Sequence, residues 1–286
     1  MIGRALKCGE IRARFIKALK GERKRILDNE LNLHSIEKSF KSEKLKADIR
    51  FFDEIGSTND VAKEIYEEEG AFALVVAASQ TKGRGRNGRN FLSDKGGAFF
   101  SLTLKLDGSE TPPEMFEFIL LSALAVSETV KSYGVTCRIK WPNDVLAGNG
   151  KKICGILTQT GYKNNKPDYI IIGTGVNVNQ TDFGIYNDIA VSMKQITHTD
   201  YNIADIIAGI VRNFFTFACL KRNEIVEIYK KRCVTLGKSV QVVSSRENYF
   251  AFAQDLSASG SLIVKTQDGK LHEVLYGDVS IREVQS

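Results

Sequence analysis

The spacing of hydrophobic positions divides the chain into three stretches. In residues 1–47, Ile11, Phe15, Ile16 and Leu19 recur at the three- and four-residue steps of an amphipathic helix. Further along, apolar runs typical of strands alternate with helical patterns, and the last fifty residues hold only short apolar runs between turn residues. The pattern predicts a helical N-terminal extension, an α/β domain and a small all-β domain, at residues 1–47, 48–236 and 237–286.

The middle stretch contains both periodicities. Apolar and β-branched runs predict strands, at residues 48–55, 72–79, 98–106, 137–141, 153–159 and 169–178. Helical spacing predicts four helices, one starting at Ser57 and the others at residues 115–131, 202–221 and 224–233. The helix at 115–131 is apolar nearly all round, which is typical of a buried helix. Pro112 and Pro113 are expected to interrupt regular structure just before it.

The C-terminal stretch predicts a small β-barrel. Its short β-rich runs lie at residues 239–243, 249–255, 261–266, 270–276 and 279–283. Asp268 and Gly269 form a strong two-residue hairpin signal between two of these runs. Short strands at such close spacing are characteristic of small barrels.

Composition excludes several classes of protein. The 286 residues are 43% hydrophobic and 26% charged, which excludes a wholly disordered chain and a coiled-coil or collagen-like rod. No stretch approaches the roughly 20 apolar residues of a membrane span. The five cysteines form no Cys-x-x-Cys pair and the three histidines lie far apart, so the sequence argues against a zinc site and fits a reducing, cytoplasmic setting.

Glycine and arginine alternate in the run Gly-Arg-Gly-Arg-Asn-Gly-Arg at residues 83–89. Glycine lets backbone N–H groups approach an oxyanion closely, and arginine adds planar, multi-donor cations. The run therefore suits a phosphate or carboxylate ligand, although it is neither a Walker A sequence nor a dinucleotide-binding fingerprint. A mobile basic loop and an RNA-binding Arg-Gly tract remain open as alternatives at this point.

Two further segments carry candidate chemistry. Lys-Trp-Pro-Asn-Asp at residues 140–144 forms a turn that presents polar groups at a strand end, and its Asp144 could bind a divalent cation or accept a proton. Lys152 enters an apolar strand and would need an anionic partner, unless the segment is simply a hairpin with a solvated lysine pair. Asn177 and Asn179 alternate onto one face at the end of another strand, where they could bind ribose or phosphate or only cap the strand.

The order and wording of these segments resemble the biotin protein ligase family. The resemblance covers the chain from about Asp48 to its end, and it departs from the family pattern conservatively at Asp278 and Ile281. Its motifs are Ser57-Thr58-Asn59, Gln80 with Gly83–Arg89, Lys140–Asp144, Lys152–Leu157, Gly173–Asn177 and Gly277–Arg282.

The resemblance implies a fold and a reaction. The fold is a class II synthetase-like α/β (α+β) catalytic domain with a mixed sheet, followed by an SH3-like C-terminal barrel. The reaction activates biotin with ATP and Mg²⁺ to biotinyl-5′-adenylate, and then transfers biotin to a lysine of a biotin carboxyl carrier domain. The implied partners are thus biotin, ATP and this carrier domain, and a second copy of the chain is a further candidate.

The resemblance also assigns roles to residues of this sequence. Biotin is assigned to Ser57, Thr58, Asn59, Gln80, Arg84, Gly85, Arg86 and Lys152. ATP is assigned to Arg84, Arg86, Asn143, Lys152, Asn177 and Arg282. The catalytic residues are Lys152, Arg86 and Asp144, and Asp144 is either the metal ligand or the proton acceptor.

Two alternative functions deserve comparison with ligation of biotin. Lipoate ligases share the adenylation chemistry, but they lack the Lys-Trp-Pro-Asn-Asp context in the form seen here. A DNA-binding repressor is suggested by residues 1–50, which contain 14 basic and 7 acidic residues. The rest of the chain contains 26 basic and 27 acidic residues. Only 56 residues precede Ser57, and a winged helix-turn-helix would hardly fit there beside the first strand. We therefore expect a basic helical extension without specific DNA binding.

Overall fold

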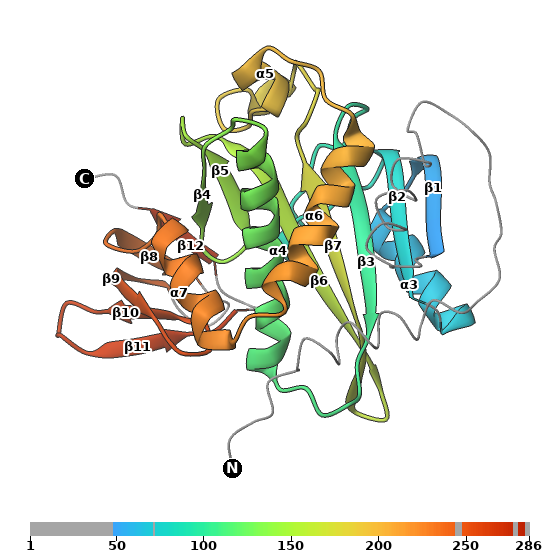
Figure 1. Ribbon diagram of the computed structural model, residues 1–286. Coiled ribbons are helices and arrows are strands. Elements are labelled where there is room, and N and C mark those ends of the chain that lie inside the picture. Colours follow the sequence, from blue (N-terminus) through green and yellow to red (C-terminus); the bar gives the residue numbers. More distant parts are fainter. Residues whose placement is uncertain (1–47, 71, 244–247, 277–279, 284–286) are drawn as a thin grey trace.

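The computed structural model describes residues 48–70, 72–243, 248–276 and 280–283 (Figure 1), the last of these by backbone alone. The helical extension predicted for residues 1–47 lies outside the described residues. None of the helices in the described part of the chain is both long and apolar enough to cross a membrane.

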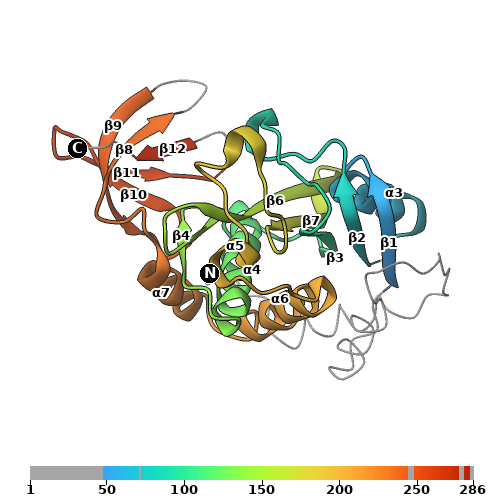
Figure 2. The same cartoon turned by 90° about the horizontal axis from the view of Figure 1, so that it is seen from above.

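A seven-stranded mixed sheet forms the centre of the larger unit (Figures 1 and 2). Its strands are β1 (Asp48–Ile55), β2 (Ala73–Gln80), β3 (Ala98–Lys105), β4 (Cys137–Lys140), β5 (Asp144–Ala147), β6 (Lys152–Lys163) and β7 (Lys166–Val176). The spatial order is β1-β2-β3-β7-β6-β5-β4, in which β1 and β2 are parallel and the other neighbours are antiparallel. The expected α/β fold with a mixed sheet is confirmed.

Helices cover the two faces of this sheet unequally. Helix α3 (Thr58–Glu69) packs on one face against Ala73 and Val75 of β2, whereas Leu74 and Val76 point into the larger core on the other side. That larger core also holds α4 (Pro112–Ser132), α6 (Ile203–Phe217) and α7 (Arg222–Arg232). The alternation along β2 is the period-two pattern of a strand buried on both faces. The α3 face is therefore left partly open, and the candidate site lies there.

The long helix α4 begins three residues earlier than predicted. Pro112 and Pro113 do not interrupt regular structure but occupy its first turn, where the missing proline N–H groups cost nothing. Thr111 and Glu114 close a capping box around this start. A short helix, α5 (Met193–Thr197), was not predicted by the apolar spacing because it has only five residues.

The C-terminal unit is a five-stranded antiparallel sheet. Its strands are β8 (Ser239–Val243), β9 (Asn248–Leu256), β10 (Leu262–Lys265), β11 (Leu271–Val274) and β12 (Ser280–Glu283), in the order β11-β10-β9-β8-β12. The predicted turn at Asp268-Gly269 joins β10 to β11, and Gly269 has the positive φ of 83° that such a turn favours.

The two units share one continuous core around Trp141. The Trp141 indole is 2% exposed, and its Nε1–H donates to the Gly260 carbonyl oxygen at 3.1 Å. Its backbone N–H donates to Thr235 Oγ1 at 3.0 Å, and the Phe116 ring of α4 packs edge-on against it. The C-terminal sheet is thereby attached to the Lys-Trp-Pro-Asn-Asp turn itself.

Candidate functional site

A cavity of about 520 Å³ opens on the sheet face that carries α3. Its lining includes the predicted residues Ser57, Thr58, Asn59, Gln80, Arg84, Gly85, Arg86, Asn143, Asp144, Lys152 and Asn177. The remaining predicted residue, Arg282, lies on β12, where only the backbone is described. The structure thus brings together segments that are up to 120 positions apart in the sequence.

Three glycines make room for the cavity on the sheet. Gly155 of β6 pairs with Gly175 of β7, and Gly173 lies two pairs further along, opposite Leu157. A Cβ on Gly173 would lie 2.1 Å from Asn59 Oδ1, and a Cβ on Gly175 would lie 2.6 Å from the Phe91 ring. The absence of side chains at these positions therefore leaves a bare floor, over which Asn59 and Phe91 approach the backbone.

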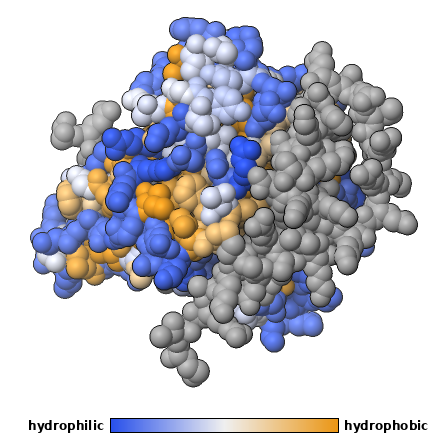
Figure 3. Space-filling view, in the orientation of Figure 1, coloured by the Kyte–Doolittle hydropathy of each residue, from blue (hydrophilic) through white to orange (hydrophobic). Residues whose placement is uncertain are grey.

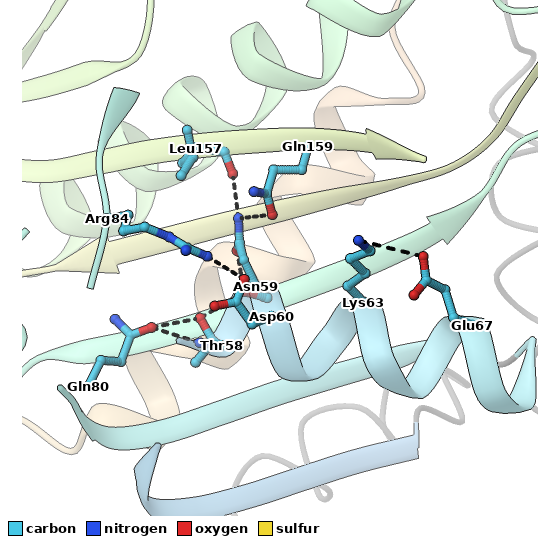
Figure 4. Close-up of polar contacts among 10 residues, drawn as sticks. Thr58, Asn59, Asp60, Lys63, Glu67, Gln80, Arg84, Leu157 and Gln159 are labelled. Carbon is cyan, nitrogen blue, oxygen red and sulfur yellow. Dashed lines mark hydrogen bonds and ion pairs between the residues drawn. The ribbon is translucent and has the colours of Figure 1, made fainter. Parts of the chain in front are cut away.

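A polar cluster forms one end of the cavity (Figure 4). The backbone N–H and the hydroxyl of Thr58 both donate to Gln80 Oε1, at 2.8 and 3.1 Å. Asn59 Nδ2 donates to Gln159 Oε1 at 3.1 Å. The Ser101 hydroxyl, which is fully buried on β3, lies 2.6 Å from Asn59 Oδ1. These contacts fix the orientation of each amide, as a site that reads hydrogen-bonding groups on a ligand requires.

Ser57 is the N-cap residue of α3, yet its hydroxyl makes no capping hydrogen bond. The side chain is 5% exposed and lines the cavity. The helix therefore does not use this hydroxyl as a side-chain cap, and the residue lines the cavity at the start of α3.

Lys152 and Asp144 form an ion pair in the middle of the cavity. Lys152 Nζ lies 2.7 Å from Asp144 Oδ1, and the two side chains are 34% and 30% exposed. The same ammonium lies 5.6 Å from the centre of the Phe91 ring. Among the described lining residues, Asp144 carries the only carboxylate. The described part of the chain contains no group of three or more His, Cys, Asp or Glu side chains that could hold a metal ion by itself.

The arginines of the glycine-rich run occupy different positions. Arg84 forms an ion pair with Asp60 of α3 at the rim (Figure 4). Arg86 is half-buried, and its guanidinium carbon lies 4.6 Å above the centre of the Tyr276 ring. Burial lowers the pKa of Arg86 from its ordinary value, while Tyr276 and Asp144 oppose that shift. The run is thus a folded loop against the cavity, with a 3-10 turn at Arg86–Gly88.

Asn143 and Asn177 have structural duties as well as a place in the lining. Asn143 Nδ2 donates to the Ile156 carbonyl at 2.7 Å, and Asn177 Nδ2 donates to the carbonyls of Lys152 and Val191 at 3.3 and 3.2 Å. Each amide nitrogen is therefore committed to backbone. Asn177 uses both amide hydrogens in this way, so its contact with a ligand would fall to the amide oxygen, whereas Asn143 uses one.

An apolar and aromatic loop at residues 183–190 forms the opposite end of the cavity, and sequence reasoning missed it. Phe183, Tyr186 and Ile189 line this end, and the Ile189 side chain is 63% exposed. The loop is held beside the lysine by backbone bonds, since the Lys152 N–H donates to the Ile189 carbonyl at 2.7 Å. Large apolar residues spaced by three in a polar segment were the available signal. Phe91 was missed as well, because it follows the motif rather than belonging to it.

The arrangement has a direction along β6. The polar cluster lies at Leu157, the bare floor lies at Gly155, and Lys152 comes next, beside the apolar loop. Such a cavity can hold a ligand that carries an amide-like ring at one end, an anionic group in the middle and a flat apolar ring at the other end.

Comparisons with known proteins agree with this geometry. Residues 51–177 match the biotin/lipoate A/B protein ligase family, and residues 235–282 match the biotin protein ligase C-terminal domain. The bifunctional ligase/repressor BirA of Bacillus spizizenii is 31% identical over 258 residues, which cover 84% of this chain and 76% of the relative. The biotin–[acetyl-CoA-carboxylase] ligase of Mycobacterium tuberculosis is 27% identical over 215 residues, or 72% of this chain and 77% of that one.

A solved structure is similar over most of the chain. The biotin protein ligase of Aquifex aeolicus, in complex with biotin and ATP, superimposes with a TM-score of 0.70 at 28% identity. The match covers 82% of this chain and 99% of the Aquifex protein. Sequence motifs, fold and relatives agree, and the chain belongs to the biotin protein ligase family.

Proposed function

We propose that the cavity binds biotin and ATP side by side, forms biotinyl-5′-adenylate and passes biotin to a lysine of a biotin carboxyl carrier domain. The observation that carries this proposal is the position of Lys152 between the polar cluster and the aromatic loop. Biotin would place its ureido ring at Thr58, Asn59 and Gln80 and direct its carboxylate toward Lys152. The adenine ring would lie against Phe183 and Tyr186.

The chain's own groups account for both steps. In the first step a carboxylate oxygen of biotin attacks the α-phosphorus of ATP and pyrophosphate leaves, so two anions must be brought together. Lys152, Arg84 and Arg86 would screen that repulsion and stabilise the charge that develops on phosphorus. In the second step the neutral amine of the carrier lysine attacks the acyl carbon, loses a proton and displaces AMP. Asp144, already beside Lys152, is the acceptor that we assign to this proton.

Magnesium fits this site only together with ATP. One carboxylate, Asp144, lines the cavity in the described part of the chain, and Mg²⁺ is commonly held by one or two carboxylates plus substrate phosphates. When bound, the ion would neutralise phosphate charge and help pyrophosphate to leave. Asn143 and Asn177 would contribute their amide oxygens on the nucleotide side.

The finer assignments of the fold are also proposals. We assign residues 48–236 to a class II synthetase-like catalytic domain and residues 237–286 to an SH3-like barrel. Support comes from the mixed sheet with its helices and from the antiparallel order β11-β10-β9-β8-β12. Arg282 on β12 would then reach the ATP side from the barrel.

Biotin ranks ahead of lipoate as the substrate because residues 235–282 match the biotin protein ligase C-terminal domain. Specific DNA binding would depend on residues 1–47, which lie outside the described residues, so our expectation against it stays a prediction. A titration with duplex DNA at several salt concentrations tests it, and a steep slope with sequence preference would support a repressor. A cytoplasmic location and a homodimer also stay predictions.

One experiment tests the central proposal. The protein is incubated with biotin, ATP, Mg²⁺ and a biotin carboxyl carrier domain, and the mass of the carrier is measured. We expect the mass gain of one biotin, dependent on ATP, and no gain when the acceptor lysine is replaced by arginine. Transfer of lipoate instead of biotin, or no pyrophosphate release, would refute the proposal.

A further inference from the structure

The glycine- and arginine-rich loop contacts the C-terminal unit as well as the cavity. The Arg86 guanidinium stacks 4.6 Å above the ring of Tyr276, which follows β11. Arg86 also lines the cavity, and the Asp144 carboxylate is close enough to favour its charged form. One residue of the loop therefore has the proposed reaction site on one side and the C-terminal unit on the other.

The Tyr276 ring is itself fixed from behind. It stacks on the Phe116 ring of α4 with centroids 5.3 Å apart and an angle of 27° between the planes. Phe116 in turn packs edge-on against Trp141, at 6.0 Å between centroids. Phe116 and Trp141 are 5% and 2% exposed, so neither ring can move without disturbing the core. Tyr276 thus presents its face to Arg86 from a rigid support.

An aromatic face suits the arginine at this position. A half-buried guanidinium loses part of its hydration. The negative face of an aromatic ring compensates for part of that loss by electrostatic attraction. A ring contacts the flat face of the guanidinium, whereas an anion in the cavity would approach along its edge.

We propose that Tyr276 is a positioning residue of this site, whose ring holds the Arg86 guanidinium over the cavity and so closes the loop on bound adenylate. Tyr276 touches no reacting atom and acts through Arg86. The proposal rests on the proposed function for its effect on adenylate, but the contact with the loop stands independently of it. The C-terminal unit therefore takes part in retaining the intermediate, through a side chain that lies outside the motif at residues 277–282.

Tyr276→Ala and Tyr276→Phe separate the ring from the hydroxyl. Loss of a cation–ring contact corresponds to a change of about 2- to 30-fold. We expect Tyr276→Ala to raise the KM for ATP and the release rate of preformed adenylate within this range, and Tyr276→Phe to stay within about twofold of the wild type. The neighbouring Leu275, which is 62% exposed, supplies the matched control Leu275→Ala, which should change neither quantity.

A double-variant comparison tests whether Tyr276 acts through Arg86. In an Arg86→Gln background, Tyr276→Ala should add less than about twofold, because the cation is already gone. An equal effect of Tyr276→Ala in both backgrounds would show a general structural role and overturn the proposal. Failure of Tyr276→Phe to preserve retention would do the same.

Limited trypsin digestion gives a readout that needs no activity. Arg84, Arg86 and Arg89 are cleavage sites in the loop. Tyr276→Ala should speed cleavage there about 2- to 30-fold, whereas Leu275→Ala should leave it unchanged. If Tyr276→Ala is cleaved faster but the wild-type protein releases no pyrophosphate, Tyr276 supports the loop and the proposed function is refuted. Unchanged cleavage in an active enzyme would refute the role of Tyr276.

Discussion

Removal of the Lys152 ammonium tests the centre of the proposed mechanism. Lys152→Ala removes the ammonium that lies 2.7 Å from the Asp144 carboxylate. That carboxylate would then repel the biotin carboxylate and the phosphates of ATP. Two losses follow: the folded protein loses an ion pair, and the transition state loses a cation where charge develops.

The structure sets the size of both losses. Exposed ion pairs contribute about 0–1 kcal/mol, and breaking a buried pair costs about 3–5 kcal/mol. Since Lys152 and Asp144 are each about one-third exposed, we expect the free energy of unfolding to fall by about 1–2 kcal/mol. Loss of a donor that faces developing charge in a preorganised site typically lowers the rate about 100- to 1,000-fold. The effect on adenylation should therefore far exceed the effect on stability.

Single-turnover release of pyrophosphate measures the first quantity, and urea unfolding measures the second. Lys151→Ala is the matched control, because Lys151 Nζ donates only to the Asn187 carbonyl, at 2.7 Å, among the contacts described. The double variant Lys152→Ala with Asp144→Ala separates the two losses: it should regain stability without regaining rate. A folded Lys152→Ala protein that forms adenylate within threefold of the wild-type rate would refute the reasoning, as would a double variant with restored rate.

Three further predictions concern the loop, the floor and the contact between the two units. Arg86→Gly should still form adenylate but release it, so that a non-carrier protein mixed with biotin and ATP becomes biotinylated; labelling at the wild-type level would contradict this. Gly173→Ala places a Cβ 2.1 Å from Asn59 Oδ1 and should weaken biotin binding by roughly 10- to 100-fold in calorimetry, whereas Gly148→Ala, with only ordinary contacts, should not. Gly260→Ala places a Cβ 2.5 Å from Leu120 Cδ1 at a φ of +87° and should lower the free energy of unfolding by about 1–3 kcal/mol. Gly269→Ala has a similar φ in open space, so an equal loss there would show that backbone strain alone is responsible.

The sequence predicted the elements whose periodicity is long and regular. The strand at Asp48–Ile55 has the predicted bounds, and the buried helix α4 was recognised from its apolar circumference. The predicted start of α4 was three residues too late, because Pro112 and Pro113 were judged by their effect inside a helix rather than in its first turn. Strand β5 was not predicted, because its four residues lie between two turns and are too few to show an alternation of apolar and polar positions.

The residues of the candidate site also fall into those that the sequence predicted and those that it did not. Polar and charged residues in motifs, such as Lys152 and Gln80, were predicted to share a site and do line one cavity. Ser101 escaped, since a serine inside an apolar strand has no distinguishing signal until the fold brings it within 2.6 Å of Asn59. The loop at residues 183–190 escaped because its apolar residues, although spaced by three, span too short a segment to predict a helix, and only a 3-10 turn forms there. Apolar contributors to a site are hard to tell from core residues before the fold is known.

Trp141 shows why the motif residues cannot all be understood as ligand contacts. Its indole N–H donates to the Gly260 carbonyl of the C-terminal stretch and its backbone N–H to Thr235 Oγ1, while Asn143 and Asp144 of the same motif line the cavity. Tyr229 of α7 also holds this turn, because its hydroxyl donates to the Pro142 carbonyl at 2.8 Å. The tryptophan of the motif therefore links the C-terminal unit to the turn that carries Asn143 and Asp144.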